Sequence, residues 1–259
     1  MALTLLFAVV SGSLTVLTVL GGVSPWWILP VWLGYYVAVA LGCILLLILA
    51  LYLFLPKGNP SPRLRRFTHR IIKSVLSWVL VMLGVRVKVT GAYKLPNTPY
   101  LLVGNHRSAF DPLCSLVAFP DDMVFVAKPG VLKIPVIGPI LKSVGVFPVR
   151  RGENDVNAVK HGLGALKSGK SLLLFPEGTR VKKGKVVEPK SGAVMFAVRT
   201  ATPILPVYLE TRRFPFSPMR CVIGKPWTPP VEGRKASPEE LHSLAKELMS
   251  IIYALGEDK

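Results

Sequence analysis

The most restrictive feature of this sequence is its N-terminal stretch of 56 residues, which contains no Lys, Arg, His, Asp or Glu. Within it, residues 3–23 and 31–55 form two apolar runs. A helix as long as the first run spans about 31 Å, enough to cross a bilayer. A glycine- and proline-containing break at 21–25, followed by two tryptophans suited to a membrane interface, separates the runs. We therefore expect a transmembrane helical hairpin in residues 1–56.

The alternative interpretation of the first run is a cleaved signal peptide. Signal peptides begin with a basic segment, and this chain has no basic residue before Lys57. A soluble cytosolic enzyme does not begin with 56 uncharged residues, and a chain that is 51% hydrophobic is not disordered. We therefore favour a membrane protein with a hairpin at its N-terminus.

A cluster of basic residues follows the second run, with no acidic residue among them: Lys57, Arg63, Arg65, Arg66, Arg70 and Lys73. By the positive-inside rule this stretch is cytoplasmic, and so are the N-terminus and the domain that follows. In a bacterium the membrane would be the plasma or inner membrane. The cluster is also expected to bind anionic phospholipid headgroups, at about 1 kcal/mol per charge.

Residues 57–84 are predicted to form a basic linker and an amphipathic helix over 62–83. One stripe of this helix is apolar, with Leu64, Phe67, Ile71, Val75, Trp78 and Met82; the opposite stripe carries Arg66, Arg70, Lys73 and Ser77. Such a helix either lies in the membrane surface or packs its apolar stripe against a protein core. We favour the membrane surface.

Residues 85–259 alternate short β-rich runs with helical patterns, which predicts an α/β domain with a mostly parallel sheet and flanking helices. The expected strands are 85–90, 100–103, 123–127, 144–149, 171–175, 204–210 and 220–223. The expected helices are 112–119, 135–143, 155–168, 191–200 and 238–255. The three cysteines, Cys43, Cys114 and Cys221, lack metal-ligand spacing and are expected to be reduced thiols in the cytoplasm.

Two polar segments directly follow predicted strands, where parallel α/β sheets bind ligands. In the first, His106 is a candidate general base. Asp111 can orient its imidazole if the residues between them form a turn. The alternative for Asp111 is an ordinary helix N-cap ahead of Pro112, a role compatible with the first.

The second segment, residues 175–180, offers a carboxylate, a glycine, a hydroxyl and a guanidinium for a phosphate ligand: Glu177, Gly178, Thr179 and Arg180. Its alternative is a solvated surface turn. Further cations end other predicted strands or precede a helix: Lys128, Arg150, Arg151 and Lys190, with Gly192 at the helix start. The net charge of +18 is typical of nucleic-acid partners, but the basic residues are densest beside the apolar runs and no nucleic-acid motif occurs. Membrane phospholipid is the better match.

These segments resemble the motifs of the glycerolipid acyltransferases. Residues 105–111 match the NH-x4-D motif, 175–180 reproduce the FPEGTR motif, 145–151 resemble the motif that ends in a substrate-binding arginine, and 204–207 resemble the proline-containing fourth motif. Lys190 to Gly192 resembles the family's K-x-G step. The order agrees over roughly residues 64–225, and the best match is the 1-acyl-sn-glycerol-3-phosphate acyltransferase of the PlsC type. Arg150 and Pro189 depart from the family pattern, where an acidic and an aromatic residue are common.

The resemblance implies transfer of a fatty acyl group from coenzyme A or acyl carrier protein to the sn-2 hydroxyl of lysophosphatidic acid, giving phosphatidic acid. His106 is then the general base and Asp111 its support. The glycerol phosphate is held by Arg151, Glu177, Gly178, Thr179 and Arg180, with Lys128, Lys190 and Gly192 as further contacts. Neither a metal nor another cofactor is implied.

Two other functions remain open. The same chemistry could use glycerol-3-phosphate, another lysophospholipid or a lyso-aminolipid as acceptor. A non-catalytic lipid-binding protein would be expected to have lost its His–Asp pair, whereas His106 and Asp111 are both present. A transporter fits poorly because the two apolar runs carry no charged residue.

Overall fold

The structure is a computed structural model, which describes residues 16, 20–21, 28–53, 62–82, 84–91, 95, 97–119, 123–150, 155–182, 185–210, 218–231 and 236–257. The chain divides into two compact units, Met1–Ala50 and Leu51–Lys259. Each unit is described separately below.

Helix α2 (Ile28–Leu53) coincides with the second predicted membrane span. Its stretch Leu33–Ala50 has a mean hydropathy of 2.5 and is long and apolar enough to cross a bilayer. The first predicted span, 3–23, lies almost wholly outside the described residues. The hairpin therefore stays a prediction, and so does the division of the chain into 1–56, 57–84 and 85–259.

Helix α3 (Pro62–Met82) is the predicted amphipathic helix, one residue shorter than expected. It contacts α4 (Asp111–Ala118), and the residues that it buries are His69, Ile72 and Leu80. These do not belong to the predicted apolar stripe, of which Leu64, Phe67, Ile71 and Trp78 are exposed. The helix thus packs a different apolar side, with Ile72 and Leu80, against the domain and leaves most of the predicted stripe exposed; the position of that stripe in a membrane surface stays a prediction.

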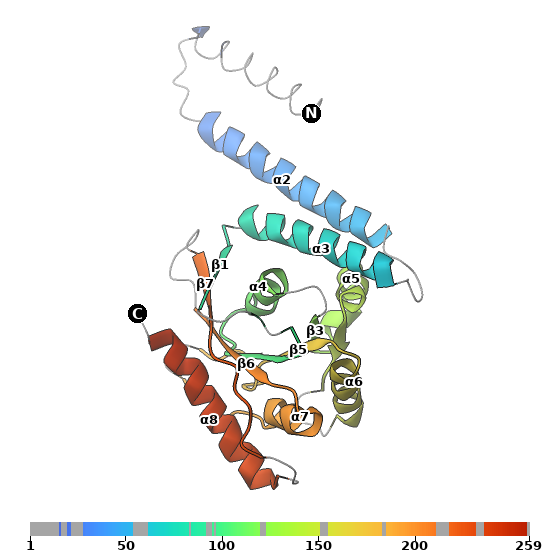
Figure 1. The fold of residues 1–259 in the computed structure, drawn as a ribbon. Helices are drawn as coiled ribbons and strands as arrows, with labels where there is room; N and C mark the ends of the chain where they lie inside the picture. The colour runs from blue at the N-terminus through green and yellow to red at the C-terminus, as the bar shows by residue number, and fades with distance from the viewer. Residues whose placement is uncertain are drawn as a thin grey trace. The chain divides into compact units, whose positions relative to one another are not determined.

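The second unit contains a seven-stranded sheet with the order β1-β7-β6-β2-β5-β3-β4 (Figure 1). The strands are β1 (Arg86–Thr90), β2 (Leu101–Gly104), β3 (Met123–Ala127), β4 (Val146–Pro148), β5 (Ser171–Leu174), β6 (Ile204–Leu209) and β7 (Pro218–Ile223). All neighbouring strands pair in parallel except β6 and β7, which are antiparallel. The predicted mostly parallel α/β sheet is confirmed.

Helices cover both faces of this sheet. The remaining ones are α5 (Ile137–Ser143), α6 (Val156–Lys167), α7 (Gly192–Thr200) and α8 (Pro238–Glu257), with a short 3-10 turn η2 (Val131–Lys133) that was not expected. Helices α6, α7 and α8 contact one another in that order and pack on one face, while α4 contacts β1 and carries α3 on the other. Each predicted strand and helix of residues 85–259 is present, with ends shifted by at most two residues.

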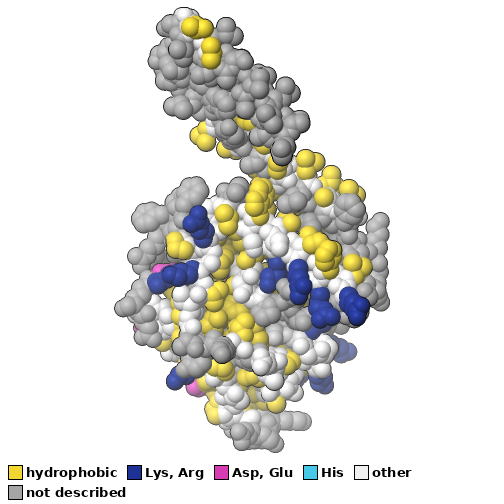
Figure 2. Space-filling model, turned by 45° about the horizontal axis from the view of Figure 1, so that its top comes forward, with side chains coloured by type: hydrophobic (Ala, Val, Ile, Leu, Met, Phe, Trp, Pro, Cys, Tyr) yellow, Lys and Arg dark blue, Asp and Glu magenta, His cyan; other side chains and the backbone are white. Residues whose placement is uncertain are grey.

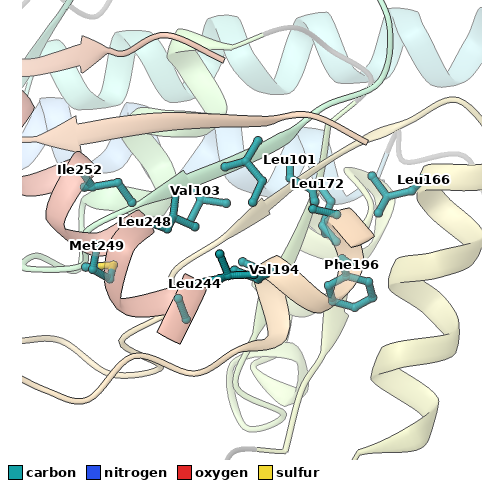
Figure 3. Packing of buried hydrophobic residues seen from close by; sticks show 14 of the residues in the cluster. Leu101, Val103, Leu166, Leu172, Val194, Phe196, Leu244, Leu248, Met249 and Ile252 are labelled. Carbon is teal, nitrogen blue, oxygen red and sulfur yellow. The ribbon is translucent and has the colours of Figure 1, made fainter. Parts of the chain in front are cut away.

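The main hydrophobic core lies between the sheet and helices α6 to α8. Leu101 and Val103 of β2 point toward α7 and α8, where they meet Val194, Leu248 and Ile252 (Figure 3). All five side chains are fully buried. Because β2 is central and packed on both faces, the loop that follows its C-terminal end starts from a rigid support.

Candidate active site

The site is built where β2 and its parallel neighbour β5 end side by side. The three-residue register between them brings the loop after Gly104 next to the loop after Leu174. The two polar segments singled out in the sequence, 105–111 and 175–180, therefore lie together, although about 70 residues separate them. This follows the general rule for ligand sites in open α/β sheets.

His106 and Asp111 face each other as predicted. His106 Nδ1 lies 2.9 Å from Asp111 Oδ2, and both residues are buried. The turn between them is closed by a hydrogen bond from the Asp111 N–H to the Ser108 carbonyl. The same Oδ2 accepts hydrogen bonds from the backbone N–H groups of Arg107 (2.6 Å) and Ser108 (2.7 Å). Three donors thus fix one carboxylate oxygen, and that oxygen fixes the imidazole.

The N-cap interpretation of Asp111 is wrong. Asp111 is the first residue of α4, the N-cap position belongs to Phe110, and no side-chain cap is formed there. The carboxylate points back to the preceding loop, because its donors are the N–H groups of Arg107 and Ser108. The side chain therefore serves the His106 loop and not the helix.

Two neighbours that the sequence analysis did not single out also hold the His106 loop. The imidazole stacks on Phe175, with ring centroids 4.6 Å apart and an interplanar angle of 21°. Asn105 is fully buried and makes two hydrogen bonds to the backbone of Leu209, donating to its carbonyl at 3.0 Å and accepting from its N–H at 2.7 Å. Both residues stand inside the motifs, so position in the motif was the available signal.

A cavity of about 570 Å³ opens beside His106. Its apolar wall comes from α4, β3, α5, β4, α6 and α7 and includes Leu113, Leu116, Phe125, Val126, Ile137, Leu141, Val146, Val159 and Phe196. Its polar lining comes from the residues after strand ends and from the start of α7: Lys128, Arg150, Asp155, Gly178, Lys190 and Gly192. The cavity thus combines an apolar wall, an imidazole and several cations.

Gly178 and Lys190 are packed against each other. Gly178 has a φ of +63°, and a Cβ added there would lie 3.1 Å from Lys190 Cε and 3.4 Å from its Cδ. The Lys190 N–H also donates to the Pro176 carbonyl at 2.8 Å. The missing side chain at 178 therefore leaves room for the lysine to lie over the FPEGTR loop with its ammonium at the cavity.

The other predicted ligands differ in position. Thr179 and Arg180 are exposed on the same loop, outside the cavity lining. Glu177 is buried and is not part of that lining either. Arg151 lies outside the described residues. Its neighbour Arg150 is held by Asp155, which accepts from the Arg150 N–H at 2.9 Å and from the Ala158 N–H at 3.0 Å.

Asp155 therefore ties the loop after β4 to the start of α6. The hydrogen bond from the Arg150 N–H, followed by that from Ala158, lowers the pKa of Asp155 from its ordinary value of 3.8.

Among the described residues, no group of three or more His, Cys, Asp or Glu side chains is placed to hold a metal ion.

Comparisons with known proteins identify the family of this chain. The acyltransferase family model matches residues 86–210. A probable 1-acyl-sn-glycerol-3-phosphate acyltransferase of Mycoplasma genitalium is 31% identical over 186 residues, which is 69% of this chain and 67% of that protein. The chain belongs to the PlsC-type acyltransferase family. The acyltransferase motifs quoted above all lie inside the residues 86–210 that the family model matches.

Two further proteins show the extent of the likeness. The chloroplastic 1-acyl-sn-glycerol-3-phosphate acyltransferase BAT2 of Brassica napus is 32% identical over 151 residues, 57% of this chain and 44% of that one. The chain spans about half the length of the first curated acyltransferases that it matches. The crystal structure of PlsC from Thermotoga maritima has the same fold, with a TM-score of 0.59, 24% identity, and coverage of 86% of this chain and 92% of that one.

Proposed function

We propose that this acyltransferase moves a fatty acyl group from an acyl thioester, of coenzyme A or acyl carrier protein, to the sn-2 hydroxyl of lysophosphatidic acid. The product would be phosphatidic acid, and the role would be in phospholipid biosynthesis. The observation that carries the proposal is the position of His106, held by Asp111 at the wall of an apolar cavity that is also lined by cations. The printed names of the curated relatives support the acceptor.

The proposed chemistry needs one base and no covalent intermediate. With its Nδ1–H donating to Asp111, His106 keeps Nε2 free of a proton, and Nε2 takes the proton of the acceptor hydroxyl. The hydroxyl oxygen attacks the thioester carbonyl, the new ester bond forms, and the carbon–sulfur bond breaks. His106 then returns its proton to the leaving thiolate. Asp111 stays ionised and stabilises the imidazolium that exists between the two transfers.

The lining of the cavity suits the two ends of the substrates. An acyl chain matches the apolar wall between α4 and α6, and a phosphate matches Lys128 and Arg150, which follow strands, and Lys190, which precedes α7. Arg151, Thr179 and Arg180 would approach the phosphate from the neighbouring loops, and Gly192 offers the N-terminal end of α7. No step of this proposal uses a metal or another cofactor.

We also propose that the protein is an integral membrane protein with its second unit on the cytoplasmic face. Helix α2 is long and apolar enough to be a span, and the exposed apolar side chains of α3 lie on the same helix as exposed Arg63, Arg66 and Arg70. On one face of the molecule, Lys and Arg side chains lie beside hydrophobic ones with few acidic side chains among them (Figure 2). An amphiphilic acceptor could then enter the site from the bilayer surface.

The test compares acceptors. The full chain in phospholipid–detergent micelles is given labelled acyl-CoA or acyl carrier protein thioester with lysophosphatidic acid, glycerol-3-phosphate or lysophosphatidylcholine. We expect acylation of lysophosphatidic acid to be faster than that of either other acceptor by at least about tenfold. Glycerol-3-phosphate lacks the acyl chain that the apolar wall would bury, and lysophosphatidylcholine lacks the phosphate monoester that the cations would bind. Faster acylation of another acceptor would contradict the proposed substrate.

Arg180→Ala probes the phosphate contact. We expect a KM for lysophosphatidic acid raised about tenfold or more, since a charge-assisted hydrogen bond contributes about 1.5–3 kcal/mol. The matched control is Arg199→Ala, which removes an exposed arginine from the last turn of α7. A KM that is equal in the two variants would refute the contact.

A further inference from the structure

Glu177 is occupied on both of its carboxylate oxygens by protein groups. Its Oε2 accepts a hydrogen bond of 2.5 Å from the backbone N–H of His106. Its Oε1 accepts a hydrogen bond from the hydroxyl of Tyr253, 76 residues further along the chain. The residue is 3% exposed and does not line the cavity. In the described part of the chain, this carboxylate thus faces the His106 loop and not the space for a ligand.

Tyr253 is itself held in place on α8. The guanidinium carbon of Arg107 lies 5.5 Å from the centre of its ring, and the ring of Tyr208 meets it edge-on at 6.4 Å. Burial, together with the hydrogen bond to Glu177, raises the pKa of Tyr253 to about 12. The hydroxyl therefore stays protonated at neutral pH and donates to Glu177.

Helix α8 is packed firmly enough against the core to hold the Tyr253 hydroxyl at Glu177. Leu248 and Ile252, which lie five residues and one residue before Tyr253, are fully buried in the main core (Figure 3). A Cβ added at Gly256 would lie 2.5 Å from the Tyr208 ring, so only glycine allows the helix and β6 to approach this closely. Tyr253 thus projects from a fixed helix end toward the loop after β5.

These contacts meet at the backbone of His106. Its N–H is bound by Glu177, its carbonyl accepts from the Val181 N–H at 2.8 Å, and its ring is held by Asp111 and Phe175. Backbone and ring are fixed independently, which removes the freedom of the imidazole to turn away from the cavity. Misplacement of a catalytic group by about 1 Å can cost on the order of 100-fold in rate.

We propose that Tyr253 is a positioning residue for His106, acting through Glu177, so that the C-terminal helix forms part of the catalytic apparatus. Glu177 is likewise a positioning residue, in place of the substrate ligand that the family resemblance implied. The effect on rate rests on the acyl transfer proposed above, whereas the effect on the geometry of His106 does not.

The kinetic test uses Tyr253→Phe, which removes the hydroxyl and keeps the ring contacts. We expect kcat to fall about tenfold while the KM for each substrate changes by less than about twofold, because neither Tyr253 nor Glu177 touches the ligand space. The matched control is Tyr100→Phe, which removes a buried hydroxyl that has no partner among the described residues. Tyr100 directly precedes the N-terminal end of β2, whereas His106 follows its C-terminal end. An unchanged kcat, or a raised KM with normal kcat, would overturn the proposal.

A double-mutant cycle tests whether Tyr253 acts through Glu177. Adding Tyr253→Phe to Glu177→Ala should lower kcat by no more than about a further twofold, because the intermediary is already gone. If the two substitutions instead lower kcat by factors that multiply in full, Tyr253 acts by another route, and the proposal that it acts through Glu177 is refuted.

A spectroscopic measurement covers the case of a wild type that acylates none of the acceptors. The chain has four histidines, so ¹⁵N-histidine labelling gives four backbone amide signals. The His106 signal, identified by its loss in His106→Ala, should lie far downfield because its N–H donates to a carboxylate. In Tyr253→Phe it should move while His242, also on α8, stays in place. An unmoved His106 signal would overturn the proposal whatever the activity.

Discussion

Asp111 offers the sharpest quantitative prediction, because one carboxylate oxygen serves three donors. In Asp111→Asn, the amide oxygen has two lone pairs and can still accept from the N–H groups of Arg107 and Ser108. Because all three donors contact the same oxygen, the amide oxygen also keeps the hydrogen bond from His106 Nδ1–H, and the NH₂ takes the place of Oδ1. The tautomer of the imidazole is therefore kept, but the negative charge beside it is lost. Without that charge the imidazolium that exists between the two proton transfers is less stable, so we expect kcat to fall on the order of 10²-fold with little loss of stability.

Asp111→Ala should behave differently. It leaves the same two backbone N–H groups without their acceptor in a partly buried loop, and each costs about 1–3 kcal/mol. Since water can reach part of this loop, we expect a total loss of about 2–4 kcal/mol in the free energy of unfolding. For a unit of this size that corresponds to a melting temperature lower by roughly 5–15 °C.

The assay measures kcat at saturating lysophosphatidic acid and acyl-CoA together with the thermal unfolding curve, in the same micelles. Glu247→Gln, an exposed neutralisation on α8, controls for the loss of a negative charge. We expect Asp111→Asn to melt at a higher temperature than Asp111→Ala and to have a similarly reduced kcat. An Asp111→Asn enzyme within tenfold of wild-type kcat, or one that melts as early as Asp111→Ala, would refute the three-donor account.

Two further predictions concern the neighbouring loops. Gly178→Ala places a Cβ 3.1 Å from Lys190 Cε at a φ of +63°. We therefore expect about 1 kcal/mol lower stability and a severalfold higher KM for lysophosphatidic acid, measured by thermal unfolding and initial rates. The control Gly164→Ala, which has open space around it in α6, should instead stabilise the protein, and equal behaviour of the two variants would contradict the packing argument. The lowered pKa of Asp155 means that its carboxylate stabilises the fold above pH 3.8 and that this contribution is lost as the pH falls through the lowered value. Asp155→Asn should therefore melt below wild type at pH 7, and the difference in melting temperature should shrink as the pH falls below 3.8; a difference that does not shrink would show that charge is not the cause.

The secondary structure of the second unit was predictable because its strands are short apolar or β-branched runs and its helices are periodic. Residues 123–127 and 171–174, for example, are bounded by turn residues and appear as β3 and β5. The order of the strands was not predictable, because periodicity does not say which strands pair. It is the placement of β2 between β5 and β6 that brings His106 to Glu177 and Asn105 to Leu209.

The candidate site shows the same division. The pairing of His106 with Asp111 was predicted because only five residues separate them and a turn suffices. The role of Asp111 as an N-cap was wrong, since its donors precede the helix. Tyr253 was not found because it lies 76 residues from Glu177 inside an ordinary amphipathic helix. The exposure of the α3 stripe could be decided only once α4 was seen to cover the other side of that helix.

The most direct test of the central claim is the rate of phosphatidic acid formation by wild type and His106→Ala in parallel. Membranes that contain each full chain receive labelled acyl thioester and lysophosphatidic acid, with protein amount and melting temperature matched. We expect wild-type membranes to form labelled phosphatidic acid and His106→Ala to lose on the order of 10²–10⁴-fold of that rate while melting like wild type. A folded His106→Ala protein that forms product at a near-normal rate would contradict the assignment of His106 as the base.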